Sequence, residues 1–286
     1  MSREALSPPR RVLLPALALA SLFLLVTATG ASADLLTPES GGSPNADAID
    51  WLYKFVFAIG IVVFIGVESL LIYTLVKYRH KRSNPEPAQI RGNTRLEIGW
   101  TLGAAVIVVV IAAVTFLQLP EIRTPPPSGP LAVASVPGTQ YAATDQPPVP
   151  GGRALTIDVT GLQYLWRYNY PQGVYSYYEM VVPTDTTVVL QITSQDVIHS
   201  WWIPKLGGKF DAVPGHTSDT WFKIADEGVY DGQCAELCGE NHAQMYGRVR
   251  AVSPAAYRGW IARQAAALRQ SQQQLAAARQ ARGGAQ

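Results

Sequence analysis

The stretch Cys234-Ala235-Glu236-Leu237-Cys238-Gly239-Glu240-Asn241-His242-Ala243-Gln244-Met245 contains both cysteines of the 286-residue chain. It also contains one of the four histidines and one of the three methionines. Two runs rich in β-branched and aromatic residues, 218–224 and 246–252, flank it and are typical of strands. The sequence therefore predicts a β-domain in which one loop between two strands carries an unusual density of sulfur and imidazole groups.

Two interpretations of the cysteines are open. A disulfide is the ordinary expectation for two cysteines in an exported domain. However, its entropic stabilisation grows with the length of the closed loop, and a spacing of four residues closes a short one. A disulfide also gives no reason for His242 and Met245 to follow so closely. Thiolate, imidazole and thioether together are the ligand set that selects copper, so the loop favours a copper site.

Other metal groups fit the spacing less well. A structural zinc site normally uses four cysteine or histidine ligands, without methionine. Attachment of a c-type haem needs Cys-x-x-Cys-His, and the cysteine spacing here is one residue longer. The loop offers one imidazole, so a second histidine must come from elsewhere in the chain.

His199 is the candidate for that second histidine. It lies in Asp196-Val197-Ile198-His199-Ser200-Trp201-Trp202, directly after a predicted strand at 187–193. The alternative, a hydrogen-bonded histidine of the core, stays open. His216 follows Pro214-Gly215 in a turn signal and is expected at the surface.

Together with Lys209-Phe210-Asp211-Ala212-Val213-Pro214-Gly215, these two motifs resemble subunit II of the haem–copper cytochrome c oxidases. The resemblance covers about 50–260. It implies a mainly β, cupredoxin-like Greek-key sandwich preceded by a two-helix transmembrane hairpin. This fold agrees with the predicted strands at 154–160, 174–181, 187–193, 218–224 and 246–252.

The resemblance implies a binuclear copper centre called CuA. Its ligands would be His199, Cys234, Cys238, His242, Met245 and the backbone carbonyl of Glu236. The two cysteines would bridge both coppers, His199 and Met245 would complete one copper, and His242 and Glu236 the other. No oxygen chemistry is expected in this chain, which would be the subunit that receives the electron.

The resemblance also implies roles for two carboxylates. The side chain of Glu236 would bind a magnesium ion shared with subunit I, unless it is a solvated loop carboxylate. Glu97, before Trp100 at the start of the second apolar run, matches a glutamate at the mouth of a proton channel. An ordinary interfacial charge is the alternative for Glu97.

The aromatic stretch around Tyr164 departs from the family. The family commonly has Gln-Trp-x-Trp, and its first tryptophan receives the electron from cytochrome c. This chain has Gln163-Tyr164-Leu165-Trp166 instead. Tyr164 and Trp166 are therefore candidates for the point where the electron enters, and simple packing of the sandwich is the alternative. His216 likewise stands where the family commonly has arginine.

Two apolar runs predict a membrane hairpin. Residues 55–76 and 99–119 are each long enough to cross about 30 Å of hydrocarbon as a helix. The loop 77–98 carries six basic and two acidic residues, which places it in the cytoplasm by the positive-inside rule. Glu68 lies near the middle of the first run, where a carboxylate costs about 3 kcal/mol, so we expect it to face a partner subunit or to be protonated.

The remaining segments complete the predicted organisation. Residues 1–33 resemble a signal peptide, with arginines, an apolar run and Ala31-Ser32-Ala33, although an uncleaved helix is the alternative. Residues 34–50 would be an exported segment, and 51–119 the hairpin. Nine prolines make 120–151 an irregular linker. The predicted CuA domain spans 152–253, and 254–286 should begin as a helix packed by Tyr257, Trp260 and Ile261 and then fray.

Composition limits the function classes. Charged residues make up 15% of the chain, against about 25% in soluble proteins, and 23 basic residues face 21 acidic ones. This balance excludes a strongly basic nucleic-acid-binding protein. Residues 120–260 contain nine basic and thirteen acidic residues, so the exported part is acidic.

We therefore predict subunit II of a cytochrome c oxidase in the plasma (inner) membrane, with its copper domain on the periplasmic side. Cytochrome c would be the electron donor, and subunits I and III and membrane lipid the other partners. The electron would pass to the haem of subunit I, where oxygen is reduced to water and protons are pumped. A membrane-tethered copper carrier is the alternative. A nitrous oxide reductase needs a larger domain, and a quinol oxidase subunit would lack the cysteines.

Overall fold

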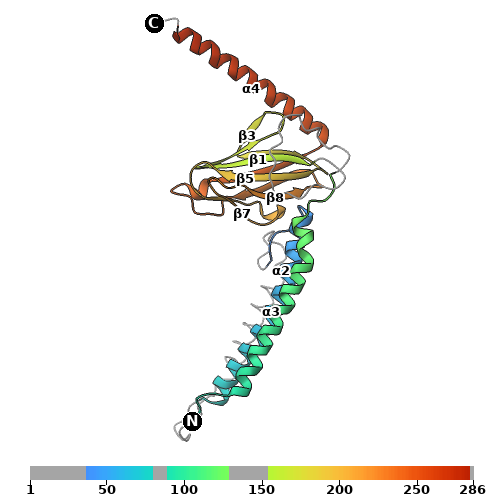
Figure 1. Ribbon diagram of the computed structural model, residues 1–286, viewed down its shortest axis with the longest axis vertical. Helices are drawn as coiled ribbons and strands as arrows, with labels where there is room; N and C mark the ends of the chain where they lie inside the picture. The colour runs from blue at the N-terminus through green and yellow to red at the C-terminus, as the bar shows by residue number, and fades with distance from the viewer. Residues whose placement is uncertain (1–36, 80–88, 129–153, 284–286) are drawn as a thin grey trace, which may run out of the picture. The chain divides into compact units, whose positions relative to one another are not determined.

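The computed structural model describes residues 37–79, 89–128 and 154–283 (Figure 1). The predicted signal peptide, His80 and most of the proline-rich linker lie outside these residues. The described residues form two long helices, a β-domain and a C-terminal helix.

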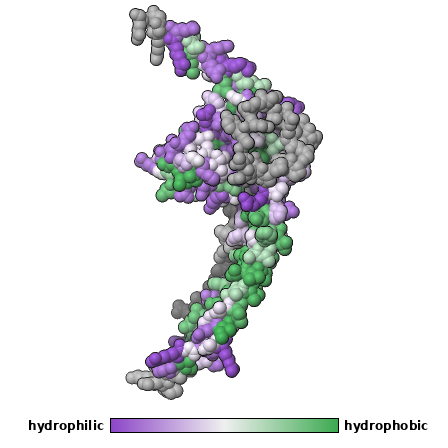
Figure 2. All heavy atoms as spheres, viewed as in Figure 1, coloured by the Kyte–Doolittle hydropathy of each residue, from purple (hydrophilic) through white to green (hydrophobic). Residues whose placement is uncertain are grey.

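The two long helices are α2 (Pro44–Lys77) and α3 (Thr94–Arg123). A proline in the first turn starts α2, where its missing N–H costs nothing. Asn93 caps α3 by accepting a hydrogen bond from the Leu96 N–H, and Glu97 accepts one from the Asn93 N–H. Both helices are long and apolar enough to cross a membrane, and the most apolar window of each is entirely unburied. Hydrophobic side chains accordingly cover their surfaces (Figure 2).

Both helices extend beyond the apolar runs that the sequence analysis picked out. The first starts at Pro44 rather than near residue 55, and the second continues to Arg123. Hydropathy detects only the part that fits in hydrocarbon, whereas the backbone hydrogen bonds of a helix continue into polar flanking residues.

The β-domain contains two main sheets. The first has the order β3-β2-β1-β5-β8 and the second β4-β10-β9, with a small β6-β7 ribbon beside them. The strands of the first sheet are β1 (Leu155–Leu162), β2 (Leu165–Asn169), β3 (Tyr175–Tyr177), β5 (Thr187–Ser194) and β8 (Ser218–Lys223). The second contains β4 (Glu179–Pro183), β9 (Gly228–Gln233) and β10 (Tyr246–Val252), and the ribbon pairs β6 (His199–Trp201) with β7 (Phe210–Ala212).

Each main sheet mixes antiparallel and parallel pairs. The β1–β5 pair and the β4–β10 pair are parallel, so the chain crosses between the sheets instead of forming only hairpins. The inner faces of the two sheets meet in one core that includes Ile157, Val159, Trp166, Leu190 and Val249. This two-sheet arrangement is the predicted cupredoxin-like sandwich.

One predicted strand is wrong. The run 174–181 forms two short strands, β3 and β4, because Tyr178 between them has a left-handed backbone with φ of 62°. Four further strands, β2, β6, β7 and β9, were not predicted. Of these, β6, β7 and β9 are short or interrupted by glycine and charged residues, so their β-propensity is weak.

The C-terminal helix α4 (Pro254–Gly283) starts against the sandwich. The Tyr257 and Trp260 rings pack on Tyr170, with ring centroids 6.5 and 5.1 Å from that of Tyr170. The helix does not fray at the expected place but continues to Gly283, because its alanine, glutamine and arginine residues favour helix without tertiary contacts.

Candidate metal centre

Two segments of the sandwich bring the predicted copper ligands together. His199 begins β6, and Cys234 directly follows β9. The chain then runs through a loop with a short 3₁₀ turn, η2 (His242–Gln244), and returns at Met245 to begin β10. We call residues 234–245 the ligand loop.

Backbone hydrogen bonds fix both ends of the ligand loop. The Cys234 N–H donates to the Met245 carbonyl at 2.9 Å, which extends the β9–β10 pairing to the first and last residues of the loop. The Ala235 N–H donates to the Ser200 carbonyl at 2.9 Å. This second bond joins the loop to β6, so it holds Cys234 beside His199.

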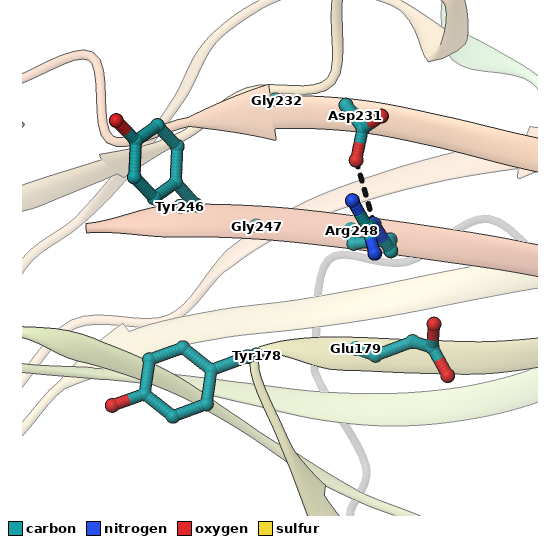
Figure 3. Close-up of a pocket in the computed structure, with 7 residues that line it drawn as sticks. All are labelled: Tyr178, Glu179, Asp231, Gly232, Tyr246, Gly247 and Arg248. Carbon is teal, nitrogen blue, oxygen red and sulfur yellow. Dashed lines mark hydrogen bonds and ion pairs between the residues drawn. The ribbon is translucent and has the colours of Figure 1, made fainter. Parts of the chain in front are cut away.

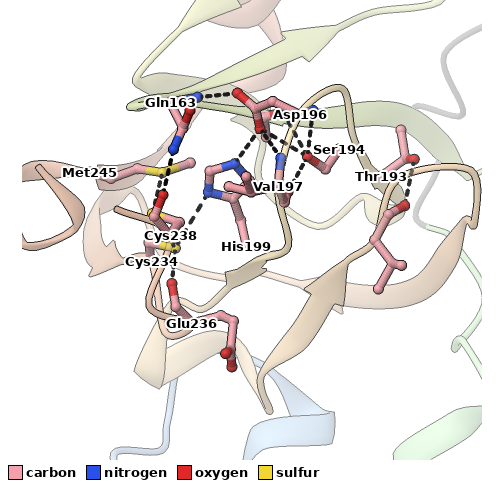
Figure 4. Close-up of polar contacts among 12 residues, drawn as sticks. Gln163, Thr193, Ser194, Asp196, Val197, His199, Cys234, Glu236, Cys238 and Met245 are labelled. Atoms are coloured by element: carbon pink, nitrogen blue, oxygen red, sulfur yellow. Dashed lines mark hydrogen bonds and ion pairs between the residues drawn. The ribbon is translucent and has the colours of Figure 1, made fainter. Parts of the chain in front are cut away.

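The donor atoms lie close to one another (Figure 4). The sulfurs of Cys234 and Cys238 are 3.9 Å apart, too far for a disulfide bond. The Nδ1 atom of His199 is 3.9 Å from the Cys234 sulfur, and the Nδ1 atom of His242 is 3.6 Å from the Cys238 sulfur. The thioether sulfur of Met245 lies 3.9 Å from the Cys238 sulfur.

The cluster is largely shielded from water. His199 and Met245 are 0% exposed, Cys234 is 2% and Cys238 is 4%, whereas His242 is half-buried. Water has little access to these buried thiols and imidazoles, so few of their polar atoms can be hydrated. A soft metal ion such as copper could bind all of them together. The His199, Cys234 and Cys238 ligand atoms lie within 4.8 Å of one another, so the residues present fit a copper site.

Asp196 orients His199. The Nε2 atom of His199 lies 2.8 Å from the Asp196 carboxylate, which leaves Nδ1 to face the Cys234 sulfur. The same carboxylate accepts hydrogen bonds from the N–H groups of Gln163 and Val197, both at 2.7 Å. A carboxylate on the second ring nitrogen commonly fixes the tautomer of a metal-binding histidine. This role of Asp196 was not predicted, although the Asp-x-x-His spacing is visible in the sequence.

The two thiols have different acidities. Burial raises the pKa of Cys234, but the contacts with His199 and with the backbone at Glu236 and Ser200 outweigh burial and lower the pKa to about 6. For Cys238, burial and the neighbouring Cys234 both raise the pKa, to about 11. Near neutral pH the metal-free pair therefore holds one negative charge, and a metal ion that binds both sulfurs must displace the Cys238 proton.

Glu236 presents its two oxygen groups to different surroundings. Its backbone carbonyl is 3.3 Å from the Cys234 sulfur, beside the other donors. Its exposed carboxylate points away from the sulfurs (Figure 4). The carbonyl and the side chain can therefore act independently.

Of the two aromatic candidates, Trp166 belongs to the core. It is 1% exposed and its ring packs edge-to-face on the His199 ring, with the centroids 5.8 Å apart. Tyr164 is half-buried, and its hydroxyl accepts a hydrogen bond from the Glu240 N–H in the ligand loop. Tyr164 is thus the aromatic residue that contacts both the loop and the surface.

Glu97 and His216 are not part of this cluster. Glu97 lies in the first turn of α3, where it caps the helix as described above, and its role at a proton channel stays a prediction. His216 is exposed in the turn before β8, as expected from its position after Pro214-Gly215.

The β-domain also has a hollow of about 480 Å³ over β4, β9 and β10 (Figure 3). Two of its three charged residues, Asp231 and Arg248, pair with each other at 2.7 Å, and both are exposed. Tyr178 lines the same hollow. None of the residues that line it brings sulfur or imidazole, so the hollow has no part in the metal centre.

Comparisons with known proteins identify the family of this chain. A family model described as "Cytochrome C oxidase subunit II, periplasmic domain" matches residues 174–252, and one described as "Cytochrome C oxidase subunit II, transmembrane domain" matches residues 32–118. The chain is 33% identical to cytochrome c oxidase subunit 2 of Cereibacter sphaeroides over 270 residues, which covers 78% of this chain and 80% of that protein. The chain belongs to the cytochrome c oxidase subunit II family.

Other matches carry the same family name. Cytochrome c oxidase subunit 2 of Alkalihalophilus pseudofirmus is 32% identical over 224 residues, which covers 76% of this chain but only 60% of that protein. The crystal structure of the periplasmic domain of subunit II of cytochrome oxidase from Bradyrhizobium japonicum is 37% identical, with a TM-score of 0.38. It covers 38% of this chain and 92% of that chain.

Family membership confirms the resemblance and the fold class that the sequence analysis gave. The two apolar helices fall in the part matched by the transmembrane model, and most of the sandwich falls in the part matched by the periplasmic model. These matches fit a membrane-anchored subunit, and the cluster of His199, Cys234 and Cys238 fits a copper site.

Proposed function

We propose that this chain is the subunit through which electrons enter a cytochrome c oxidase. Reduced cytochrome c would give one electron at a time to a binuclear copper centre of the CuA type, and the electron would continue to the haem of subunit I. The observation that carries this proposal is the convergence of His199 from β6 with the two thiols, the imidazole and the thioether of the ligand loop.

The residues that would hold the copper pair are Cys234, Cys238, His199, His242, Met245 and the carbonyl of Glu236. When bound, copper ions held by these thiolate, imidazole and thioether groups would supply a site for one-electron transfer. The protein contributes rigidity, because the buried donors extend from paired strands and from a loop closed at both ends. Ligands that move little between oxidation states reduce the reorganisation cost of electron transfer.

The surface above the ligand loop suits a protein donor. Leu237 is 79% exposed, and the acidic residue Glu240 in the same loop is exposed as well. An apolar contact beside a carboxylate would suit a cytochrome c that presents basic residues, with the charges mainly increasing the association rate. Tyr164 lies next to Glu240, so we propose it as the place where the electron enters.

The remaining roles belong to the assembled oxidase. We propose that α2 and α3 span the plasma membrane with their connecting loop in the cytoplasm and the sandwich on the periplasmic side. Subunits I and III and lipid would then cover the apolar helix surfaces. The free carboxylate of Glu236 would bind magnesium at the contact with subunit I, and Glu97 would lie at a proton channel. Oxygen would be reduced in subunit I.

A membrane-tethered copper carrier is less well supported. A carrier exchanges its metal, which is easier from exposed ligands than from a cluster in which four donor residues are at most 4% exposed. The membership in an oxidase subunit family also speaks against a carrier.

Rapid mixing of the assembled oxidase with reduced cytochrome c tests the proposal. Replacing Cys238 by serine removes one of the two thiols that would hold the copper, so we expect the fast oxidation of cytochrome c to be lost. Replacing Tyr178, an exposed residue outside the ligand loop, by phenylalanine is the control and should retain fast electron transfer. Fast oxidation in the Cys238→Ser oxidase at the wild-type rate would contradict the proposed function.

A further inference from the structure

The two-residue turn Gln163-Tyr164 joins β1 to β2 and lies against the ligand loop. The side-chain amide of Gln163 donates a hydrogen bond to the Cys238 carbonyl at 2.7 Å. The Tyr164 hydroxyl accepts one from the Glu240 N–H at 3.1 Å. Among the residues that the structure describes, these two bonds are the ones that link the tip of the loop, 238–241, to the rest of the domain.

The loop backbone approaches this turn closely at Gly239. A Cβ atom at Gly239 would lie 2.6 Å from the Tyr164 hydroxyl oxygen and 2.9 Å from the Gln163 amide nitrogen. Gly239 also has a φ of 131°, which side chains rarely adopt. The absence of a side chain therefore allows the tip of the loop to rest directly on the Gln163 and Tyr164 side chains.

The same turn also reaches the other half of the metal centre. The Gln163 N–H donates to one oxygen of the Asp196 carboxylate, and the other oxygen lies 2.8 Å from His199 (Figure 4). The backbone of this turn is thus linked to His199 through the Asp196 carboxylate. Its two side chains are linked to the loop that carries Cys238 and His242.

We propose that Gln163 and Tyr164 are positioning residues of the metal centre, which hold the tip of the ligand loop at a fixed distance from His199. In this role Tyr164 acts through its hydroxyl and not only through its ring. This inference rests on the proposed function in one respect, namely that His199 and the side chains of the ligand loop hold copper. The contact between the turn and the loop does not itself depend on a metal.

The role of the hydroxyl can be separated from that of the ring. Phenylalanine keeps the ring but cannot accept the Glu240 hydrogen bond. Tryptophan keeps a larger ring, and its indole N–H is a donor only. If the hydroxyl positions the loop, Tyr164→Phe and Tyr164→Trp should behave alike. If an aromatic surface is all that matters, Tyr164→Trp should behave like the wild type.

Hydrogen exchange on the copper-free, full-length chain in detergent tests the proposal without any activity. We expect the peptide that contains Glu240 to exchange roughly five- to tenfold faster in Tyr164→Phe and in Tyr164→Trp, which is the equilibrium effect of one hydrogen bond. Gln163→Leu, which removes the bond to the Cys238 carbonyl, should accelerate the same peptide. The matched control is Tyr178→Phe, at an exposed tyrosine in the hollow over β4, and it should leave that peptide unchanged.

Copper-loaded samples then report on the geometry of the donors. We expect Tyr164→Phe and Tyr164→Trp to shift the copper hyperfine splitting and the reduction potential in the same direction, with Tyr178→Phe at the wild-type values. Unchanged exchange of the Glu240 peptide in all three variants of the turn would overturn the proposal. Failure of the wild-type chain to bind copper would instead overturn the proposed function, while the exchange result would still decide whether the turn positions the loop.

Discussion

His199 and the ligand loop contribute to one cluster, but they reach it in different ways. His199 lies on a strand, is 0% exposed, and is held by Asp196 on one ring nitrogen. The ligand loop supplies the other donors within twelve residues and leaves Glu236, Leu237 and Glu240 exposed. The strand fixes where the centre lies in the fold, whereas the loop supplies most of its chemistry and its surface.

We expect His199, which lies on β6, to have both a structural and a chemical role. Replacing His199 by alanine should abolish copper binding and lower the free energy of unfolding by about 2–4 kcal/mol, because it opens a cavity in the core and leaves Asp196 without its imidazole partner. Copper content and denaturant unfolding of the purified full-length chain measure both effects.

His242→Ala is the matched variant on the loop side. This histidine is half-buried, so its loss should weaken copper binding but change the free energy of unfolding by less than about 1 kcal/mol. Equal destabilisation by the two alanine variants would show that the strand and the loop do not differ as described.

A substitution of Met245, at the end of the ligand loop, distinguishes the contribution of its packing from that of its sulfur as a metal ligand. Leucine has a similar volume, so Met245→Leu should cost less than about 1.5 kcal/mol of stability although the residue is 0% exposed. Because leucine has no thioether sulfur, the copper spectrum and the reduction potential should nevertheless change. An unaltered spectrum in Met245→Leu would remove Met245 from the set of donors.

The smallest effect is expected at Glu236. Glu236→Gln alters the exposed carboxylate but keeps the backbone carbonyl beside Cys234. The copper content and spectrum of the isolated chain should therefore equal those of the wild type. A changed copper spectrum would mean that the side chain, and not the carbonyl, belongs to the centre.

The structure brings together the cysteine, histidine and methionine side chains that the sequence singled out, whereas several details of the fold were not predicted. Cysteine, histidine and methionine at short spacings are visible without coordinates, and His199 stood out because it follows a predicted strand. The roles of Gln163 and Asp196 could not be predicted, because they depend on contacts between the β1–β2 turn, the segment before β6 and the ligand loop. Such contacts arise from strand pairing, as in the parallel alignment of β1 with β5.

Element boundaries were predicted least well. Hydropathy located both apolar helices but gave their ends several residues too short, because helical hydrogen bonding continues outside the apolar run. The break at Tyr178 has no sequence signal, since tyrosine rarely adopts a left-handed backbone. The length of α4 follows from helix propensity, which outweighed the expectation that a polar tail would fray.

The most direct test of the central claim is the copper content and the electron paramagnetic resonance spectrum of the full-length chain purified with copper. We expect two coppers per chain and the seven-line hyperfine pattern of one unpaired electron shared equally by two copper nuclei. A single copper with a four-line pattern, or a Cys234–Cys238 disulfide without metal, would contradict it.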